Sequence, residues 1–434
     1  MLNLITFNRW WDTGVVDAVY LKPHKRPLFH DLEKFLEARQ ILLIYGLRRV
    51  GKTTLLYQLI DSLLKKGVAK KHILYFSFDE KAASLEELLK SYAETVLGKD
   101  LLKSGKVYVF LDEVQKLKDW QTQLKIFYDL YPNIKFLVSG SASLVISKEA
   151  KESLAGRMYE FVLPLLSFSE YLKLLGESVL PPVDIFNLEK LKELHLQKER
   201  LSPLFVPYLK KGGFIEIAAE EDDLKIRAYS RSILERIIFS DIPQSFKIKE
   251  PHILKAIIEL VASNPGFLLD YSKLAETLGK DQRVVADYVF YLKYSLLVKL
   301  LYNFSGSRFA SERKLKKIYL TSTNFIYQTQ PEKFSDPEFL GKIVENLITA
   351  TLPSEFFWRQ RQTEVDVISK GKVPLEVKYK EVIHRDDLKG VLKFCSRFSQ
   401  RKAIVVTKEE LKQEEIDGVQ VLFIPAWLFA ITYQ

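Results

Sequence analysis

The sequence predicts an α/β protein whose amino-terminal half holds a parallel sheet. Three observations lead to this prediction: short continuous apolar runs typical of buried strands, helical periodicity between them, and a glycine-bounded loop after the first run. Strands that alternate with helices favour βαβ units, which build parallel sheets. The 434 residues are enough for two to four domains.

Composition excludes several classes of protein. One cysteine cannot form an internal disulfide framework or a cysteine-type zinc site, and the six histidines show no metal-ligand spacing. The first thirty residues contain no signal-peptide core, and no apolar run approaches the roughly 18 residues that span a bilayer. We therefore expect a cytoplasmic protein without a membrane partner. Its net charge of +10 is compatible with an anionic partner such as nucleic acid.

Four strands and three helices are expected in the first 140 residues. The strands cover 41–45, 73–78, 107–111 and 134–138, and the helices cover 53–64, 84–97 and 120–131. Ser84 and Glu87 form the Ser-x-x-Glu pattern of a capping box at the start of the second helix. This succession predicts a first domain over residues 1–165.

After residue 163 the pattern becomes mostly helical, and we expect a helical lid over 166–249. Three short helices are then expected at 254–262, 271–278 and 282–294, ahead of a strand at 296–304. Helix, turn, helix and hairpin in this order predict a winged helix over 250–310. A basic connector leads into a last α/β domain over 311–434; its basic residues are Arg313, Lys314, Lys316 and Lys317.

The strongest functional signal is a phosphate loop. Residues 46–53 match G-x-x-x-x-G-K-[ST] and lie between a buried strand and a helix, which is the context that the motif requires. Backbone N–H groups of such a loop bind phosphate, Lys52 adds a positive charge, and the Thr53 hydroxyl can bind Mg²⁺. A chance match in a surface turn would lack this context. The residues expected to bind ATP are Gly46, Arg48, Arg49, Gly51, Lys52, Thr53, Thr54 and Asp112.

Two acids, Asp112 and Glu113, follow the strand at 107–111. We expect Asp112 to hold Mg²⁺ together with Thr53, and Glu113 to orient and deprotonate the attacking water. The alternative is that the two acids only cap the next helix. Their position after a phosphate loop and a buried strand favours the catalytic interpretation.

Ser139 and Arg157 are further candidates, each with a plain structural alternative. A hydroxyl at Ser139, after the fourth strand, can sense the γ-phosphate or position the water, or it can belong to an ordinary turn. Arg157 can serve as an arginine finger or sensor, or form a surface salt bridge. The residues expected to act in catalysis are Lys52, Glu113, Ser139, Arg157 and, in the last domain, Lys378.

The order of these motifs resembles a known family. The succession runs through Trp10-Trp11, the phosphate loop with Arg48-Arg49, Asp112-Glu113-Val114-Gln115, Ser139-Gly140-Ser141, Gly156-Arg157, residues 163–170 and Gly212-Gly213-Phe214. It is similar to the archaeal and bacterial AAA-type ATPases that carry a winged helix and a C-terminal restriction-endonuclease-like domain. The resemblance implies an AAA-type core and ATP hydrolysis coupled to nucleic-acid transactions or to defence.

A second site is expected in the last domain. Asp366, followed by Glu376 and Lys378, resembles the PD-(D/E)xK nuclease motif, and Glu345 fits its upstream helical carboxylate, although Val365 replaces the proline. Glu345, Asp366 and Glu376 would share Mg²⁺ or Mn²⁺, and Lys378 would activate water. Asp366 faces Glu376 only if an odd-length loop joins their strands. The sequence leaves this open, together with the alternatives of an edge hairpin with solvated charges or a nuclease relic.

Charge also points to a phosphate-rich ligand for this domain. Residues 355–402 hold 12 Lys or Arg and seven Asp or Glu, a net charge of +5. The sequence therefore predicts a Mg²⁺-dependent ATPase that acts on duplex or branched DNA and carries a metal-dependent endonuclease domain. The alternative is a nucleotide switch, a regulatory ATPase whose nuclease-like fold binds DNA or a protein partner without cutting. The DNA substrate, the pathway and the oligomeric state stay open.

Overall fold

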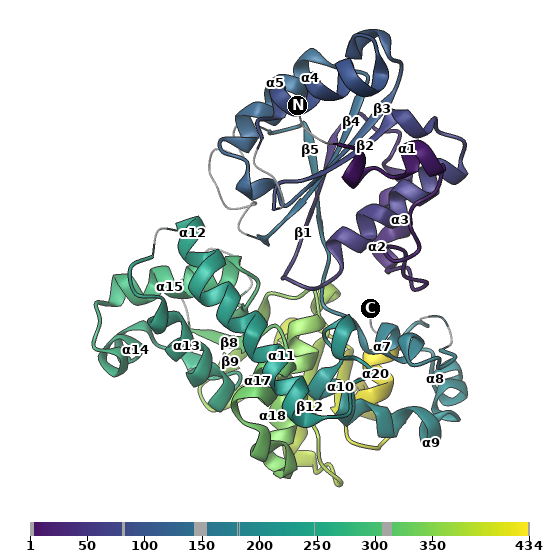
Figure 1. Cartoon of the computed structure of the whole chain (residues 1–434). Helices are drawn as coiled ribbons and strands as arrows, with labels where there is room; N and C mark the ends of the chain where they lie inside the picture. The colour runs from purple at the N-terminus through teal and green to yellow at the C-terminus, as the bar shows by residue number, and fades with distance from the viewer. Residues whose placement is uncertain are drawn as a thin grey trace. The chain divides into compact units, whose positions relative to one another are not determined.

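The computed structural model describes residues 4–79, 83–142, 154–179, 181, 183–246, 248–305 and 315–432. The chain divides into two compact units, residues 1–164 and 165–434, which are described one after the other (Figure 1). No helix in these described ranges is long and apolar enough to cross a membrane.

The first unit is built on a five-stranded parallel sheet in the order β2-β3-β4-β1-β5. Its strands are β1 (Ile41–Tyr45), β2 (Ile73–Ser77), β3 (Val107–Asp112), β4 (Ile134–Gly140) and β5 (Met158–Val162). The parallel sheet expected in this half is thus confirmed. β5 was not expected from the sequence, because this edge strand is mostly exposed and lacks a continuous buried apolar run.

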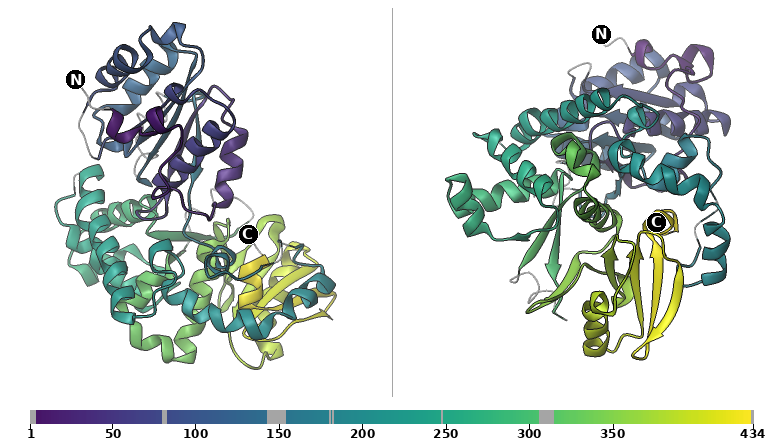
Figure 2. Two further views of the ribbon diagram at one scale, coloured as in Figure 1. Left: turned by 45° about the vertical axis from the view of Figure 1, so that its right-hand side comes forward. Right: turned by 90° about the horizontal axis from the view of Figure 1, so that it is seen from below.

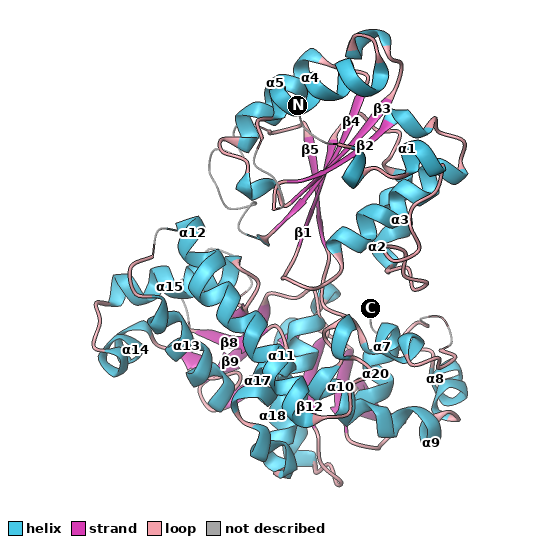
Figure 3. Ribbon diagram, in the orientation of Figure 1, coloured by secondary structure: helices cyan, strands magenta, loops and turns pink. Residues whose placement is uncertain are grey.

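Helices cover both faces of this sheet (Figure 3). α1 (Trp10–Thr13), α2 (Pro27–Lys34) and α3 (Lys52–Lys65) lie on one face, and α4 (Leu85–Tyr92) and α5 (Trp120–Leu130) lie on the other. Right-handed crossovers explain this division, since the chain runs from β1 to β2 in one direction across the sheet and returns through β3 to β4. The capping box opens α4: Ser84 accepts from Glu87 N at 3.1 Å, and Glu87 accepts from Ser84 N at 2.9 Å.

The second unit begins with short helices. They are α7 (Phe168–Leu174), α8 (Leu188–His195), α9 (Lys198–Leu201), α10 (Phe205–Lys211), α11 (Asp223–Arg236) and α12 (Ile242–Phe246). Three further helices follow: α13 (Pro251–Ser263), α14 (Tyr271–Leu278) and α15 (Gln282–Tyr294). Asp270 and Asp281 cap the amino termini of α14 and α15 with their side chains, and Gly279 ends α14 in a left-handed conformation. Both helices begin and end at the residues expected from the sequence, because such caps define helix ends locally.

After α15 the chain enters a mixed sheet in the order β10-β9-β7-β8-β6. Its strands are β6 (Leu268–Leu269), β7 (Val298–Asn303), β8 (Lys316–Leu320), β9 (Phe356–Gln360) and β10 (Thr363–Val365). β7 pairs with β8 in antiparallel fashion and with β9 in parallel fashion. This sheet therefore joins strands from both sides of residue 310, where the sequence placed a domain boundary. Of the basic connector, Arg313 and Lys314 lie outside the described residues, whereas Lys317 is buried within β8.

The last sheet, in the order β11-β12-β13-β15-β14, appears in yellow-green and yellow in Figure 2. Its strands are β11 (Val367–Ile368), β12 (Pro374–Lys378), β13 (Lys402–Thr407), β14 (Lys412–Ile416) and β15 (Val419–Pro425). Helices α17 (Thr323–Thr329) and α18 (Pro337–Thr351) precede it, α19 (Lys389–Phe398) packs against β12 and β13, and α20 (Ala426–Thr432) ends the described chain. The buried core between α19 and the sheet includes Phe394, Cys395 and Val405.

Candidate functional sites

The phosphate loop follows the carboxyl end of β1 and leads directly into α3. Two of its glycines are required by the backbone. A Cβ on Gly46 would lie 2.4 Å from the carbonyl oxygen of Leu163, and Gly51 has a φ of 96° at the amino terminus of α3. The loop can therefore curl tightly, with the first turn of α3 directed toward an anion.

Lys52 is the cation of this loop. Its side chain is 6% exposed, and Nζ donates hydrogen bonds to the carbonyl oxygens of Gly46 at 3.2 Å and Leu47 at 2.9 Å. The ammonium thus lies inside the curl of the loop, where a bound phosphate would meet it. Arg48 and Thr54 are partly buried, and Arg49 is exposed with a left-handed φ of 65°.

Asp112 accepts hydrogen bonds from four groups. It ends β3, is 2% exposed, and accepts hydrogen bonds from Thr53 Oγ1 at 2.6 Å and Tyr75 OH at 3.1 Å. Ser139 Oγ donates to its other carboxylate oxygen, as does the backbone N–H of Glu113. Burial and the charge of Asp112 raise the pKa of Tyr75, so that hydroxyl remains a donor. Thr53 and Asp112 together offer the hydroxyl and carboxylate oxygens that Mg²⁺ prefers.

Glu113 sits at a sharp bend after β3, in a left-handed conformation with a φ of 53°. The side-chain amide of Gln115 donates a hydrogen bond to Glu113 Oε2. The carbonyl oxygen of the same amide accepts from Ser141 N at 3.3 Å, just beyond β4. Gln115 therefore links the Glu113 carboxylate to the end of the neighbouring strand, a role for which its sequence position alone gave no signal.

Arg157 does not join this group. It precedes β5, and the parallel register pairs Ile41 with Met158, so Arg157 lies at the amino-terminal edge of the sheet. The phosphate loop follows the opposite, carboxyl edge. The guanidinium binds Asp129 on α5 at 3.0 and 3.2 Å, and this pairing raises the pKa of Arg157. Within one chain, therefore, Arg157 forms a surface salt bridge, which was the alternative to a role as arginine finger or sensor.

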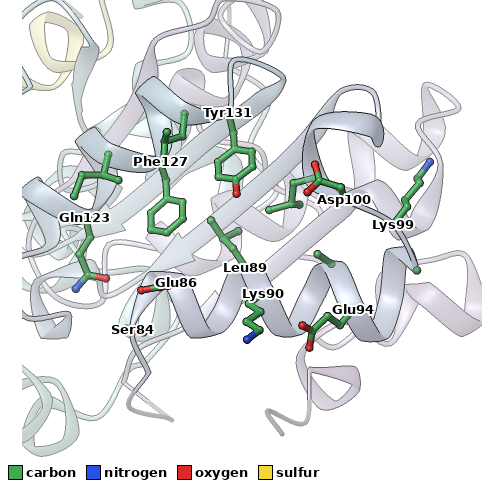
Figure 4. Close-up of a pocket in the computed structure, with 15 residues that line it drawn as sticks. Ser84, Glu86, Leu89, Lys90, Glu94, Lys99, Asp100, Gln123, Phe127 and Tyr131 are labelled. Atoms are coloured by element: carbon green, nitrogen blue, oxygen red, sulfur yellow. The ribbon is translucent and has the colours of Figure 1, made fainter.

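A separate surface cavity of about 990 Å³ lies between α4, the π-helical turn Ala93–Leu97 and α5 (Figure 4). Leu89, Phe127 and Tyr131 form part of its apolar lining, and Glu94 and Lys99 lie near its rim. It contains no residue of the phosphate loop, and it is distinct from the nucleotide site.

The second group of expected residues surrounds the junction of β10, β11 and β12. β11 pairs with β12 so that Val367 lies opposite Leu375 and Ile368 opposite Pro374. The same register places Asp366 opposite Glu376, and the loop between the strands, residues 369–373, has an odd length. The two acids therefore lie on the same face, and Asp366 also accepts from Val377 N at 2.9 Å.

Glu345 of α18 points toward these acids rather than into solvent. Its Oε1 accepts from Tyr319 OH at 2.7 Å and lies 3.3 Å from Lys317 Nζ. Lys317 also lies 3.5 Å from Asp366 Oδ1 and forms an ion pair with Glu364. Lys317, Tyr319 and Glu364 were not among the expected site residues. Lys317 and Tyr319 lie on β8, which precedes the nuclease-like motif by about fifty residues and carries no motif of its own, whereas Glu364 lies two residues before Asp366 on β10.

On the other side of Asp366, Lys378 Nζ lies 2.6 Å from Glu376 Oε1. Burial and then the negative charge of Asp366 raise the pKa of Glu376 well above its usual range, and they raise that of Glu345 to about 7. Burial alone would lower the pKa of Lys378, but Glu376 and Asp366 outweigh it and keep the ammonium charged. The cluster thus contains four acids, which are Glu345, Glu364, Asp366 and Glu376, and only two ammonium groups, which are those of Lys317 and Lys378.

The donor set suits a hard divalent cation. Glu376 is 6% exposed, and its Oε2 has no hydrogen-bond partner among the residues that the structure describes, so a buried carboxylate oxygen remains available for a cation. Across the residues that the structure describes, however, no three His, Cys, Asp or Glu side chains already stand in metal-binding geometry. The ammonium of Lys317 lies within 3.5 Å of both Glu345 Oε1 and Asp366 Oδ1.

Comparisons with known proteins match successive segments of the chain. Residues 38–172 match a family model described as an AAA domain. Residues 202–327 and 340–427 match two models described as domains of unknown function, DUF8612 and DUF4143.

Two whole proteins are also similar to most of this chain. An uncharacterized protein of Haemophilus influenzae is 25% identical over 413 residues, 92% of this chain and 96% of that protein. Uncharacterized protein MJ1637 of Methanocaldococcus jannaschii is 30% identical over 335 residues, 73% of this chain and 69% of that protein. Among solved structures, the Walker-type ATPase PABY2304 of Pyrococcus abyssi has a TM-score of 0.42 at 16% identity, covering 71% of this chain and 99% of that one.

Proposed function

The chain belongs to the protein family that includes MJ1637 and has an AAA-type P-loop ATPase core, and from this premise we propose that it couples ATP hydrolysis to an action on DNA. The observation that carries the proposal is the set of bonds around Asp112. Thr53, Ser139 and Tyr75 all donate to this one carboxylate at the carboxyl edge of the sheet.

In the proposed reaction, Lys52 and the backbone N–H groups of the loop bind the phosphates and stabilise the charge that develops during transfer. Thr53 and Asp112 would hold Mg²⁺, which supplies neutralising charge next to the phosphates. Glu113 would orient the attacking water and accept its proton, and Gln115 would fix the direction of that carboxylate. Ser139 would act through Asp112, since its hydroxyl is already bonded there.

For the second unit we propose a winged helix over residues 250–310 and a nuclease-like domain over 311–434, preceded by a helical lid. The charge of the nuclease-like domain supports a contact with DNA, whereas that of the proposed winged helix does not. Residues 250–304 contain six Lys or Arg and six Asp or Glu, so they bring no net charge to a phosphate backbone. The basic excess of residues 355–402 makes the nuclease-like domain the stronger candidate for contacting DNA.

The proposed second activity is cleavage of a phosphodiester. Glu345, Asp366 and Glu376 would hold Mg²⁺ or Mn²⁺, whose charge would stabilise the reacting phosphate, and Lys378 would orient the water. Support comes from the shared face of Asp366 and Glu376 and from the unpartnered Oε2 of Glu376.

A second candidate function is the nucleotide switch, in which the nuclease-like domain binds DNA or a protein partner without cutting. The observation that favours it is Lys317, whose ammonium pairs with carboxylates that the cutting mechanism needs for a metal.

A nuclease assay on linear and branched DNA separates the two candidates. The wild type and Asp366→Ala are incubated with Mg²⁺ or Mn²⁺, with and without ATP. Cleavage by the wild type that Asp366→Ala abolishes supports the nuclease. Absence of cleavage by the wild type in every condition, with ATP hydrolysis intact, supports the switch.

A further inference from the structure

Lys317 is a buried cation that the proposed chemistry does not use. It belongs to β8, its residue is 5% exposed, and its Nζ lies 3.3 Å from Glu345 Oε1 and 3.5 Å from Asp366 Oδ1. The same ammonium pairs with Glu364. Two of these three acids are the ones proposed to hold a divalent cation.

A metal ion and this ammonium cannot occupy the cluster together. Mg²⁺ and Mn²⁺ bind carboxylate oxygens at about 2.0–2.2 Å, so an ion bound to both Glu345 and Asp366 would take the space between them where Nζ now lies. The two cations would also repel each other strongly over so short a distance in a buried site. Lys378 does not create this conflict, because it binds Oε1 of Glu376, and Oε2 has no hydrogen-bond partner among the described residues.

The position of Lys317 is set by the sheet that also contains β10 and by the packing of β8 on α18. β8 is held in register by β7, with Leu301 opposite Lys317, and by β6, with Leu268 opposite Lys317. Both partner strands belong to the helix-and-hairpin segment that begins with α13. The strand is also fixed directly to the helix that carries Glu345, because Leu320 N donates to Asn346 Oδ1 at 3.0 Å and Asn346 Nδ2 donates to the carbonyl oxygen of Leu320 at 2.8 Å.

We propose that Lys317 is a built-in cation that excludes the divalent metal, so that the nuclease-like site is closed to metal while this ammonium pairs with Glu345 and Asp366. This inference rests on the metal role proposed above for Glu345, Asp366 and Glu376. Removal of the charge of Lys317 should therefore open the site to metal.

The test is a titration of the full-length chain with Mn²⁺, without nucleotide, followed by the electron paramagnetic resonance of free Mn²⁺. Wild type is compared with Lys317→Met, which keeps the length and removes the charge, and with Lys317→Gln, which retains a hydrogen-bond donor if the first variant does not fold. Lys317→Arg keeps the charge. Lys299→Met is the matched control, because Lys299 is a partly buried lysine on the adjacent β7 that bonds to the carbonyl oxygens of Thr349 and Leu352 instead of to acids.

Loss of the ammonium should tighten Mn²⁺ binding by about 10- to 100-fold in Lys317→Met or Lys317→Gln, and leave it unchanged in Lys317→Arg and Lys299→Met. Adding Asp366→Asn to Lys317→Met should abolish the gain, which locates it in this cluster.

The outcomes separate this inference from the proposal on which it rests. If wild type binds Mn²⁺ through Asp366 as tightly as the charge-removed variants do, Lys317 excludes nothing, and the metal site itself survives. If no variant binds Mn²⁺ in a manner that depends on Asp366, the metal site fails and the inference fails with it.

Discussion

The hydroxyl of Thr53 donates a 2.6 Å hydrogen bond to Oδ2 of Asp112, although 59 positions separate them in the chain. Thr53 follows β1 and Asp112 ends β3, and β4 lies between these two strands in the sheet. Both residues therefore reach the same edge, and Ser139 at the end of β4 completes the contact from the middle. This arrangement makes the nucleotide site sensitive to single substitutions.

Substitutions at Lys52 and Glu113 should separate nucleotide binding from hydrolysis. Lys52→Ala removes the ammonium that faces the phosphates and should weaken ATP binding, measured by titration calorimetry. Glu113→Gln should keep binding and reduce hydrolysis by about 10²–10⁴-fold, the usual contribution of a general base. Lys65→Ala, at the far end of α3, is the control for loss of a lysine from the same helix. Normal turnover in Glu113→Gln would remove Glu113 from the role of base.

Gln115→Ala should lower kcat for ATP hydrolysis by about tenfold with little change in KM, because the amide orients the base and does not contact the nucleotide. Gln115→Glu, which can no longer donate to Glu113, should be at least as impaired. Steady-state kinetics on both variants provide the measurement. Gln123→Ala on α5, whose amide bonds to Leu85 N, is a matched control and should behave as wild type. A rise in KM at constant kcat would show that Gln115 acts in binding instead.

DNA binding should depend on the exposed basic face of α19. Lys389, Lys393 and Arg397 recur every four residues and so lie along one side of this helix. Replacing Lys393 and Arg397 with glutamate should weaken DNA binding and lower the slope of log affinity against log salt by about two. Fluorescence anisotropy across a salt series measures both quantities. The same reversal at Lys190 and Lys192 on α8 should have a smaller effect, and affinity independent of salt would contradict the electrostatic model.

Stability should fall with rising pH because of Glu345. The pKa of this carboxyl is about 7 in the folded chain against an ordinary value of 4.5, so the folded state binds the additional proton between those values. The free energy of unfolding should therefore decrease as pH rises from about 5 to about 7, and remain lower above that. Glu345→Gln should gain stability over wild type at pH 8, by an amount of the order of 2 kcal/mol, and less at pH 5. Denaturant unfolding at the two pH values tests this, with exposed Glu338→Gln on the same helix as the control. An equal effect of Glu345→Gln at both pH values would contradict the assignment.

The elements that the sequence predicted well are those in which local chemistry and packing agree. Buried strands such as Ile41–Tyr45 are continuous apolar runs, and helix α14 begins at an aspartate cap and ends at a glycine. The phosphate loop and Asp112 could be located for the same reason, since the motif depends on adjacent residues. All five residues of the edge strand β5 are exposed or partly exposed, so it has no buried apolar face that the sequence could reveal.

The contacts that the sequence could not predict join residues through the sheets. Tyr75 reaches Asp112 only because β2 is the neighbour of β3. Lys317 reaches Asp366 only because β8 packs on α18 and belongs to the same sheet as β10. Neither residue has a local pattern that distinguishes it from a buried strand residue. Arg157 is the opposite case. It follows the other motifs in the sequence, but the register of β5 places it at the amino-terminal edge of the sheet, away from the phosphate loop.

The parallel pairing of β7 with β9 bears on how this protein could have been assembled in evolution. Tyr302 and Asn303 pair with Phe356 and Phe357, so a cut near residue 310 would leave two open strand edges in place of one sheet. Open edges with unpaired backbone groups promote aggregation. The segment that contains β7 and the nuclease-like domain that contains β9 therefore share one sheet. A recombination event that kept one of them would have had to keep the other.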